Sequence, residues 1–152
     1  MLKNIPVICS AAIIAVILFQ SAFIAPAVNK IINVKEASVF LRFIWPKFFL
    51  IIASISLFAF ISTMFYNTSQ NLPRYFFVIS FVLMLSCYFI TPLINEAKDS
   101  SNEQLWTILH MCTILLTLNT LVLNVSTLYF CLLYTSDAAD EGLGVDLGGR
   151  RI

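Results

Sequence analysis

Polar side chains recur at a regular spacing in the last apolar segment of the chain, where they could bind a ligand or another helix. Steps of three, four, three and four residues put them on one stripe of an α-helix. Because a polar group that faces lipid costs free energy, such a stripe is expected to face the interior of a helical bundle. The stripe consists of His110, Thr113, Thr117, Thr120 and Asn124.

Two functions fit this stripe, and the sequence leaves both open. Interhelical hydrogen bonds, worth about 0.6–2 kcal/mol each, would make it a packing surface. An ionisable residue inside an apolar segment also indicates a binding or permeation path, which His110 and Asn119 or Asn124 would line. Asn119 lies off the stripe and would contact a different neighbour. Gln20, in the first apolar segment, is available as a partner from another helix.

The sequence offers no set of residues for catalysis or for holding a metal. His110 is the one histidine of the chain, and a single histidine does not make a typical haem or copper site. Cys112 points well away from His110 on a helix, so the two side chains would not share a ligand. The sequence contains no phosphate-binding glycine loop, carboxylate pair or nucleophile triad. We therefore expect no catalytic residue, no metal and no cofactor.

The composition indicates that lipid surrounds the chain. Hydrophobic residues make up 60% and charged residues 11% of its 152 residues, and the mean hydropathy is +0.92. Soluble domains contain about 45–50% apolar and about 25% charged residues, so this chain cannot cover itself with polar surface. We expect an integral membrane protein whose first partner is the lipid bilayer. The net charge of +1 provides no basic surface for nucleic acid.

Four apolar segments are long enough to cross a bilayer, which takes about 20 residues of helix. Backbone polar groups in lipid need partners within their own segment, so each segment is expected to be α-helical. The sequence therefore predicts an all-α fold, an integral membrane four-helix bundle that occupies residues 1–130. The expected spans are residues 6–28, 45–66, 72–94 and 105–130.

Basic residues predict the orientation of the spans, because lysine and arginine are more frequent in cytoplasmic loops. Loops 29–44 and 95–104 are expected in the cytoplasm and both termini outside, in a bacterial inner (cell) membrane. Loop 29–44 mixes apolar and charged residues, which favours either a surface helix or a helical extension of the second span. The basic residues on the expected cytoplasmic side are Lys30, Lys35, Arg42, Lys47 and Lys98, against Lys3 and Arg74 on the other.

A short pattern recurs at the ends of the first and third spans. Residues 23–29 are FIAPAVN and residues 89–95 are FITPLIN. Because these spans run in the same direction, the recurrence favours a parallel repeat of two helical hairpins, with chance similarity as the alternative. Proline removes a backbone donor, so helices are expected to kink or end near Pro26 and Pro92, and Pro46 lies where the second span begins.

The sequence changes character after residue 130. All four glycines of the chain lie beyond this point. Residues 131–141 (CLLYTSDAADE) resemble a translated transposase adapter from DNA library preparation, and residues 145–152 (VDLGGRRI) resemble a translated flow-cell adapter. Such segments are excluded from fold reasoning. We expect residues 131–152 to be a non-native, disordered tail.

Three stretches carry a family resemblance. They are residues 19–26 (FQSAFIAP), residues 40–49 (FLRFIWPKFF), and Thr91-Pro92 taken together with residues 106–110 and Asn119. Over residues 5–130 the chain resembles the domain of unknown function 4149 family, a transmembrane-protein-205-like group, although it lacks the glycine that this family often has in helix one. The resemblance implies a four-helix membrane fold. It implies no enzymatic activity, because none is established for the family.

Three functions remain, in decreasing order of support. The first is a membrane scaffold or accessory protein that acts through helix packing, with a second copy or another membrane protein as its partner. The second is a small transporter or channel that uses the polar stripe of the fourth span. The third is a cofactor-binding membrane redox protein, which the single histidine disfavours.

Overall fold

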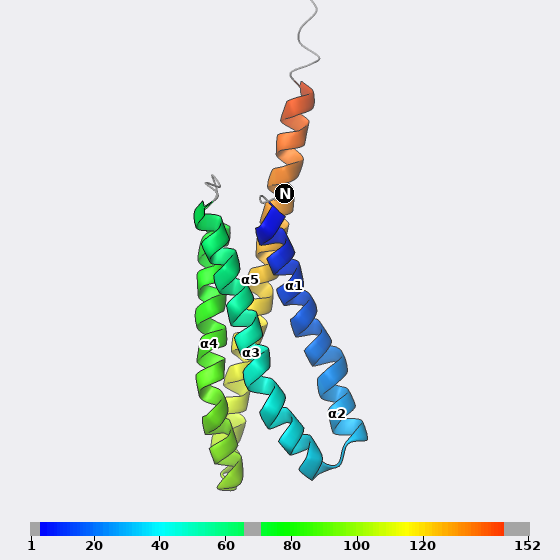
Figure 1. Cartoon of the computed structure of the whole chain (residues 1–152), viewed down its shortest axis with the longest axis vertical. Helices are drawn as coiled ribbons and strands as arrows, with labels where there is room; N and C mark the ends of the chain where they lie inside the picture. The colour runs from blue at the N-terminus through cyan, green and yellow to red at the C-terminus, as the bar shows by residue number, and fades with distance from the viewer. Residues whose placement is uncertain (1–3, 66–70, 145–152) are drawn as a thin grey trace, which may run out of the picture.

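The computed structural model describes residues 4–65 and 71–144, and the side chains up to residue 132. Four rods of helix make up this part of the chain, each long and apolar enough to cross a membrane (Figure 1). This confirms the predicted all-α, four-helix architecture. The elements are α1 (Ile5–Phe19), a π-helical turn η2 (Gln20–Ile24) and α2 (Ala25–Ile31) in the first rod, followed by α3 (Val34–Phe65), α4 (Leu72–Asp99) and α5 (Glu103–Gly144).

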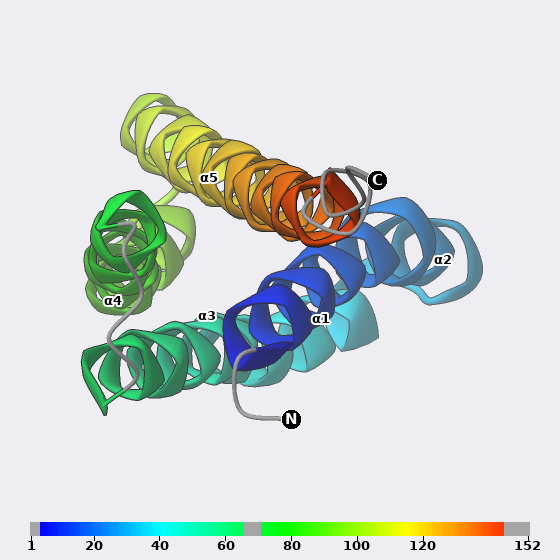
Figure 2. The same ribbon diagram turned by 90° about the horizontal axis from the view of Figure 1, so that it is seen from above.

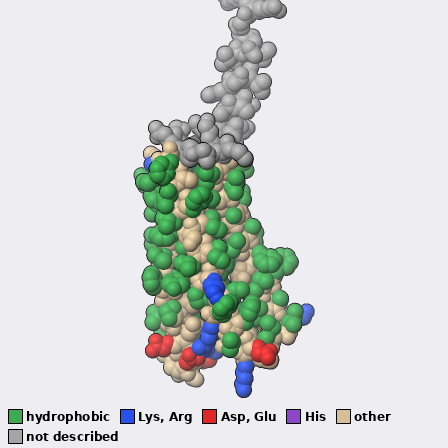
Figure 3. All heavy atoms as spheres, in the orientation of Figure 1, with side chains coloured by type: hydrophobic (Ala, Val, Ile, Leu, Met, Phe, Trp, Pro, Cys, Tyr) green, Lys and Arg blue, Asp and Glu red, His purple; other side chains and the backbone are tan. Residues whose placement is uncertain are grey.

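The four rods form a ring (Figure 2). α3 lies between α1 and α4, and α5 closes the ring between α4 and α1. The α2–α3 and α4–α5 connections lie together at one end of the bundle, which we call the loop end; α1 begins at the opposite end. Most of the charged side chains visible in Figure 3 gather at the loop end, while the flank is mainly apolar. The predicted pairing of the two loops on one side is therefore confirmed, and their cytoplasmic location stays a prediction.

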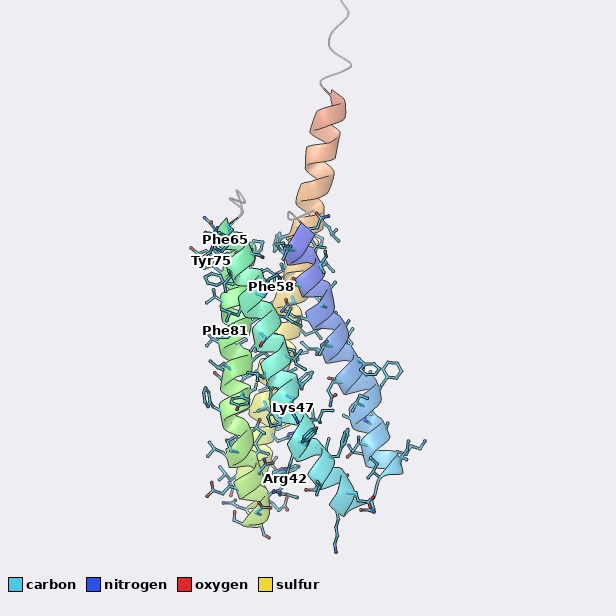
Figure 4. All side chains as sticks on the ribbon, viewed as in Figure 1. Arg42, Lys47, Phe58, Phe65, Tyr75 and Phe81 are labelled. Carbon is cyan, nitrogen blue, oxygen red and sulfur yellow. The ribbon has the colours of Figure 1, made fainter. Side chains whose placement is uncertain are left out.

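The inner faces of the helices follow the three-and-four spacing of left-handed bundles. The outer faces carry large apolar side chains, including Phe58 and Phe65 of α3, which are 58% and 81% exposed (Figure 4). An exterior of this kind is stable in lipid and unfavourable in water. The buried face of α4 consists of Pro73, Phe77, Ser80, Met84, Cys87, Thr91 and Ala97.

Two of the three prolines expected at helix ends lie inside helices. Pro46 is within α3 and Pro92 is within α4. A proline removes one backbone donor, but ending the helix would leave several groups without partners, so the helix continues in an apolar setting. Pro26 instead follows the π-helical turn, whose wider coil accommodates the ring. The two copies of the repeated pattern thus differ in backbone conformation, and the repeat itself stays a prediction.

Two boundaries differ from the predicted spans. α3 begins at Val34, so residues 34–44 are the helical extension of the second span and not a separate surface helix. α5 continues to Gly144, so residues 131–144 are helical in this structure, where a disordered tail was expected. An existing helix grows without a new nucleus, so it can continue beyond the bundle. Residue 66 and residues 145–152 lie outside the described part, and the adapter origin of the tail stays a prediction.

The variant Ala59→Leu tests the packing of α3 against its neighbours. Ala59 is 0% exposed and packs with Cys9 and Phe77, so a leucine has no room. We expect a loss of about 1–3 kcal/mol in the free energy of unfolding, measured in detergent or lipid. Phe58→Leu, at the neighbouring outward position, is the control and should change stability by less than about 0.5 kcal/mol. Equal stability of Ala59→Leu and the unmodified chain would contradict this packing.

Candidate functional site

A cavity of about 500 Å³ lies between the helices at the loop end. All four rods contribute to its wall, because α2 and the first turns of α3 lean away from α4 and α5 there (Figure 1). Exposed residues such as Asn29, Val34 and Lys98 line it as well, so the cavity is reachable from the surface. The inner wall is mainly apolar and includes Ile17, Leu18, Leu41, Trp45, Phe48, Phe49, Ile114, Leu118 and Leu121.

Two cations line the cavity, and each is held by an exposed ion pair. Arg42 of α3 donates two hydrogen bonds to the Asp99 carboxylate of α4, at 2.9 and 2.5 Å. Lys98 Nζ lies 3.0 Å from Glu103 Oε1 and 4.6 Å from the centroid of the Trp106 ring. Exposed ion pairs contribute little stability, typically about 0–1 kcal/mol, so an incoming anion could compete for either cation.

The structure brings part of the polar stripe of α5 to this cavity. His110 is half-buried, and its ring stacks on that of Trp106 with centroids 5.3 Å apart and planes 12° apart. Thr113 and Thr117 line the wall one and two turns further along. Their hydroxyl groups donate to the carbonyls of His110 and Thr113, both at 2.8 Å. The Cys87 thiol of α4 also donates to the Thr113 carbonyl, at 3.9 Å, so this part of the stripe also contacts a second helix.

The remaining predicted residues lie elsewhere. Asn124 is 1% exposed in the bundle core, where its Nδ2 donates to Ser80 Oγ of α4 at 3.1 Å. Asn119 is exposed on the outer face of α5. Gln20 is 6% exposed, and its Nε2 has no partner within residues 4–65 and 71–132. None of these three lines the cavity.

Sequence reasoning missed the mouth of the cavity. It treated Arg42 and Lys98 as indicators of orientation and Trp106 as part of a resemblance, whereas all three line the cavity. The sequence did contain a signal for this position, namely the possible helical extension of the second span through residues 29–44. A helix through residue 42 places this arginine about one turn before Trp45, at the membrane boundary, where its guanidinium can reach α4.

The lining of the cavity offers groups that can bind a ligand. It combines an apolar wall with two cations at the mouth, and with amide and hydroxyl groups from Asn29, Ser38 and Asn95. Among the described residues, no group of three or more His, Cys, Asp or Glu side chains could hold a metal ion. The lining suits a molecule with an apolar body and an anionic or hydrogen-bonding head.

Comparison with known proteins found no family model, no curated protein and no solved structure that matches this chain. The resemblance to the domain of unknown function 4149 family therefore stays a prediction. The site is interpreted from its own geometry.

Two asparagines of α5 provide a matched pair of variants. Asn124→Leu removes the hydrogen bond to Ser80 in the core and should cost about 0.6–2 kcal/mol of unfolding free energy. Asn119→Leu, on the outer face of the same helix, should leave stability unchanged or raise it in lipid, because it removes an exposed polar group. Thermal unfolding in lipid vesicles measures both. A larger loss for Asn119→Leu would contradict the orientation of α5.

Proposed function

We propose that this chain is a non-enzymatic accessory or scaffold protein of a bacterial inner (cell) membrane, and that it holds an amphiphilic molecule in the cavity at its loop end. The cavity carries this proposal, because all four rods line it and its polarity changes from apolar inside to cationic at the mouth. In this proposal, residues 29–44 and 95–104 face the cytoplasm and the cavity opens on that side.

The size and lining of the cavity support an amphiphile. Its volume of about 500 Å³ is within the range of about 300–1,000 Å³ that small-molecule sites occupy. Trp45, Phe48 and Phe49 offer an apolar surface for a hydrocarbon chain. Arg42 and Lys98 are the charged residues among those that line the cavity, so a carboxylate or phosphate head would meet positive charge there.

The core beyond the cavity favours an accessory role over a channel. Toward the opposite end of the bundle, Ile52, Phe77 and Met84 are 0% exposed and fill the space between the helices. The hydroxyl of Thr120 bonds to the carbonyl of Leu116 on its own helix, at 3.0 Å. Hydroxyl groups that bond to carbonyls of their own helix support helix packing and do not form a continuous path for ions.

The outer face of the first rod supports a partner. Ala11 and Ala15 of α1 and Ala22 of η2 are exposed, and small residues let another helix approach closely. A second copy of this chain or another membrane protein could pack there. We expect the partner to be recognised through lipid-facing surfaces.

Binding of a fluorescent long-chain fatty acid, compared with the alcohol of the same chain length, tests the proposal on purified protein. The acid should bind more tightly than the alcohol, because only the acid carries the anionic head. Lys98→Gln should weaken binding of the acid about fivefold, the equivalent of about 1 kcal/mol, and leave the alcohol unchanged.

Two further variants serve as controls for this experiment. Lys30→Gln removes a cation from the loop end that does not line the cavity, so binding of the acid should stay the same. Ser38→Phe fills the cavity at its mouth and should abolish binding of both probes. Undiminished binding to Ser38→Phe would contradict the cavity as the site.

A small transporter is the second candidate, favoured by the position of the cavity. A site that all helices line and that opens toward one end also corresponds to one state of a carrier with alternating access. We expect reconstituted vesicles to conduct no more sodium or potassium than vesicles without protein, and His110→Leu to change nothing. Ion or solute flux that His110→Leu abolishes would favour the transporter instead.

A further inference from the structure

One cross-section of the bundle core contains a small polar residue from every rod. Ser10 of α1, Ser56 of α3, Ser80 of α4 and Asn124 of α5 are each at most 1% exposed. We call this cross-section the polar layer. None of its members lines the cavity at the loop end, so it is a separate feature of the molecule.

Two clusters of buried side chains define the depth of the polar layer. Each takes residues from α1, α3 and α4, and the two lie one above the other along the bundle. On each of these helices the serine falls between the residues that belong to the two clusters, so the three serines share one depth. The clusters include Cys9, Ala59 and Phe77 on one side, and Ile13, Ile52 and Met84 on the other.

Asn124 belongs to the same layer through its hydrogen bonds. Its Nδ2 donates to Ser80 Oγ at 3.1 Å and to the carbonyl of Thr120 at 2.8 Å. A carbonyl oxygen can only accept, so the bond to Thr120 identifies which end of the side-chain amide carries the nitrogen. Oδ1 is therefore the end that these two bonds leave free to accept a hydrogen bond.

Three oxygens of the polar layer have no hydrogen-bond partner in the described part of the chain. They are Ser10 Oγ, Ser56 Oγ and Asn124 Oδ1. Other buried hydroxyls of this bundle, such as those of Thr120 and Thr127, donate to carbonyls of their own helix. The polar layer thus differs from its surroundings, because its buried hydroxyl and amide oxygens lack partners among the described residues.

We propose that the polar layer binds a single water molecule that joins α1, α3 and α5. One water can accept a hydrogen bond from each of the two serine hydroxyls and donate one to Asn124 Oδ1, and about three bonds are usual for a buried water. This arrangement holds the helices in axial register. A slide of one turn would set the hydroxyls against the apolar clusters on either side.

The neutrality of the layer favours water over a cation. All of its members are uncharged, and the clusters on either side consist of apolar side chains together with Cys87 in one and Cys9 in the other. A bare ion at this depth would lie in a medium of low dielectric constant without a counter-charge, which is strongly unfavourable.

The water is observable by solid-state NMR of the full chain in lipid vesicles. Magnetisation should pass from water to the side-chain amide of Asn124, and the transfer should be lost in Ser56→Ala. Ser54→Ala is the matched control, because Ser54 is exposed on the same helix and bonds to the carbonyl of Leu50 at 2.8 Å. The transfer from water to the Asn124 amide in this variant should match that of the unmodified chain. Absence of transfer in the unmodified chain overturns the proposal.

Stability provides a second measurement. Ser10→Ala and Ser56→Ala should each lower the midpoint of thermal unfolding by about 2–4 °C. The double variant should lose less than the sum, because both serines hold the same water. Unchanged or higher unfolding midpoints for the single variants would show that the serine hydroxyls bind no water and would overturn the proposal. An unfolding midpoint that rises when sodium replaces choline in the buffer would show that the polar layer binds a cation, and this result would also overturn the proposal.

Discussion

The rest of this structure depends on one constraint, which is that the backbone hydrogen bonds of each helix must form within that helix. The outer faces carry side chains such as Phe58 and Leu93, so the surroundings of the bundle offer the backbone no partners. The helices therefore continue through Pro46 and Pro92. Before Pro26 the chain forms a π-helical turn, and it then remains helical as far as Ile31. Four long rods follow from this constraint before any contact between them is made.

The same constraint shapes the interior of α5. Its inward face carries threonines, whose hydroxyls bond to carbonyls of their own helix, as Thr113, Thr117 and Thr120 do. These side chains can then pack against residues of α1 and α4 without leaving their hydroxyl groups unpaired. Asn124 is different, because its amide reaches Ser80 on α4. Helix α5 is thus polar inside and apolar outside, the reverse of a helix in a soluble bundle.

Polar contacts at both ends hold α3 to α4. Arg74 donates to the carbonyl of Thr63 at one end, at 2.9 Å, and Arg42 forms its ion pair with Asp99 at the other. The first rod has no comparable ion pair among the described residues, and α2 leans outward beside the start of α3 (Figure 1). The cavity lies where this first rod departs from the others. Its wall is mainly apolar, and Arg42 and Lys98 line it near the ends of α3 and α4 that lie at the loop end.

Hydrophobic length and periodicity were enough to predict four helices, their approximate spans and the stripe of α5, because these properties are local to each segment. The stripe residues Thr113 and Asn124 are buried, as the three-and-four spacing indicates, whereas Asn119, which was expected to contact another neighbour, is exposed. Periodicity shows which face of a helix turns inward, but it contains no information about the level at which that face meets another helix. The polar layer, the pairing of Arg42 with Asp99 and the cavity all depend on that level. Only the packing of the four rods against each other decided them, since these contacts join residues that are far apart in the chain.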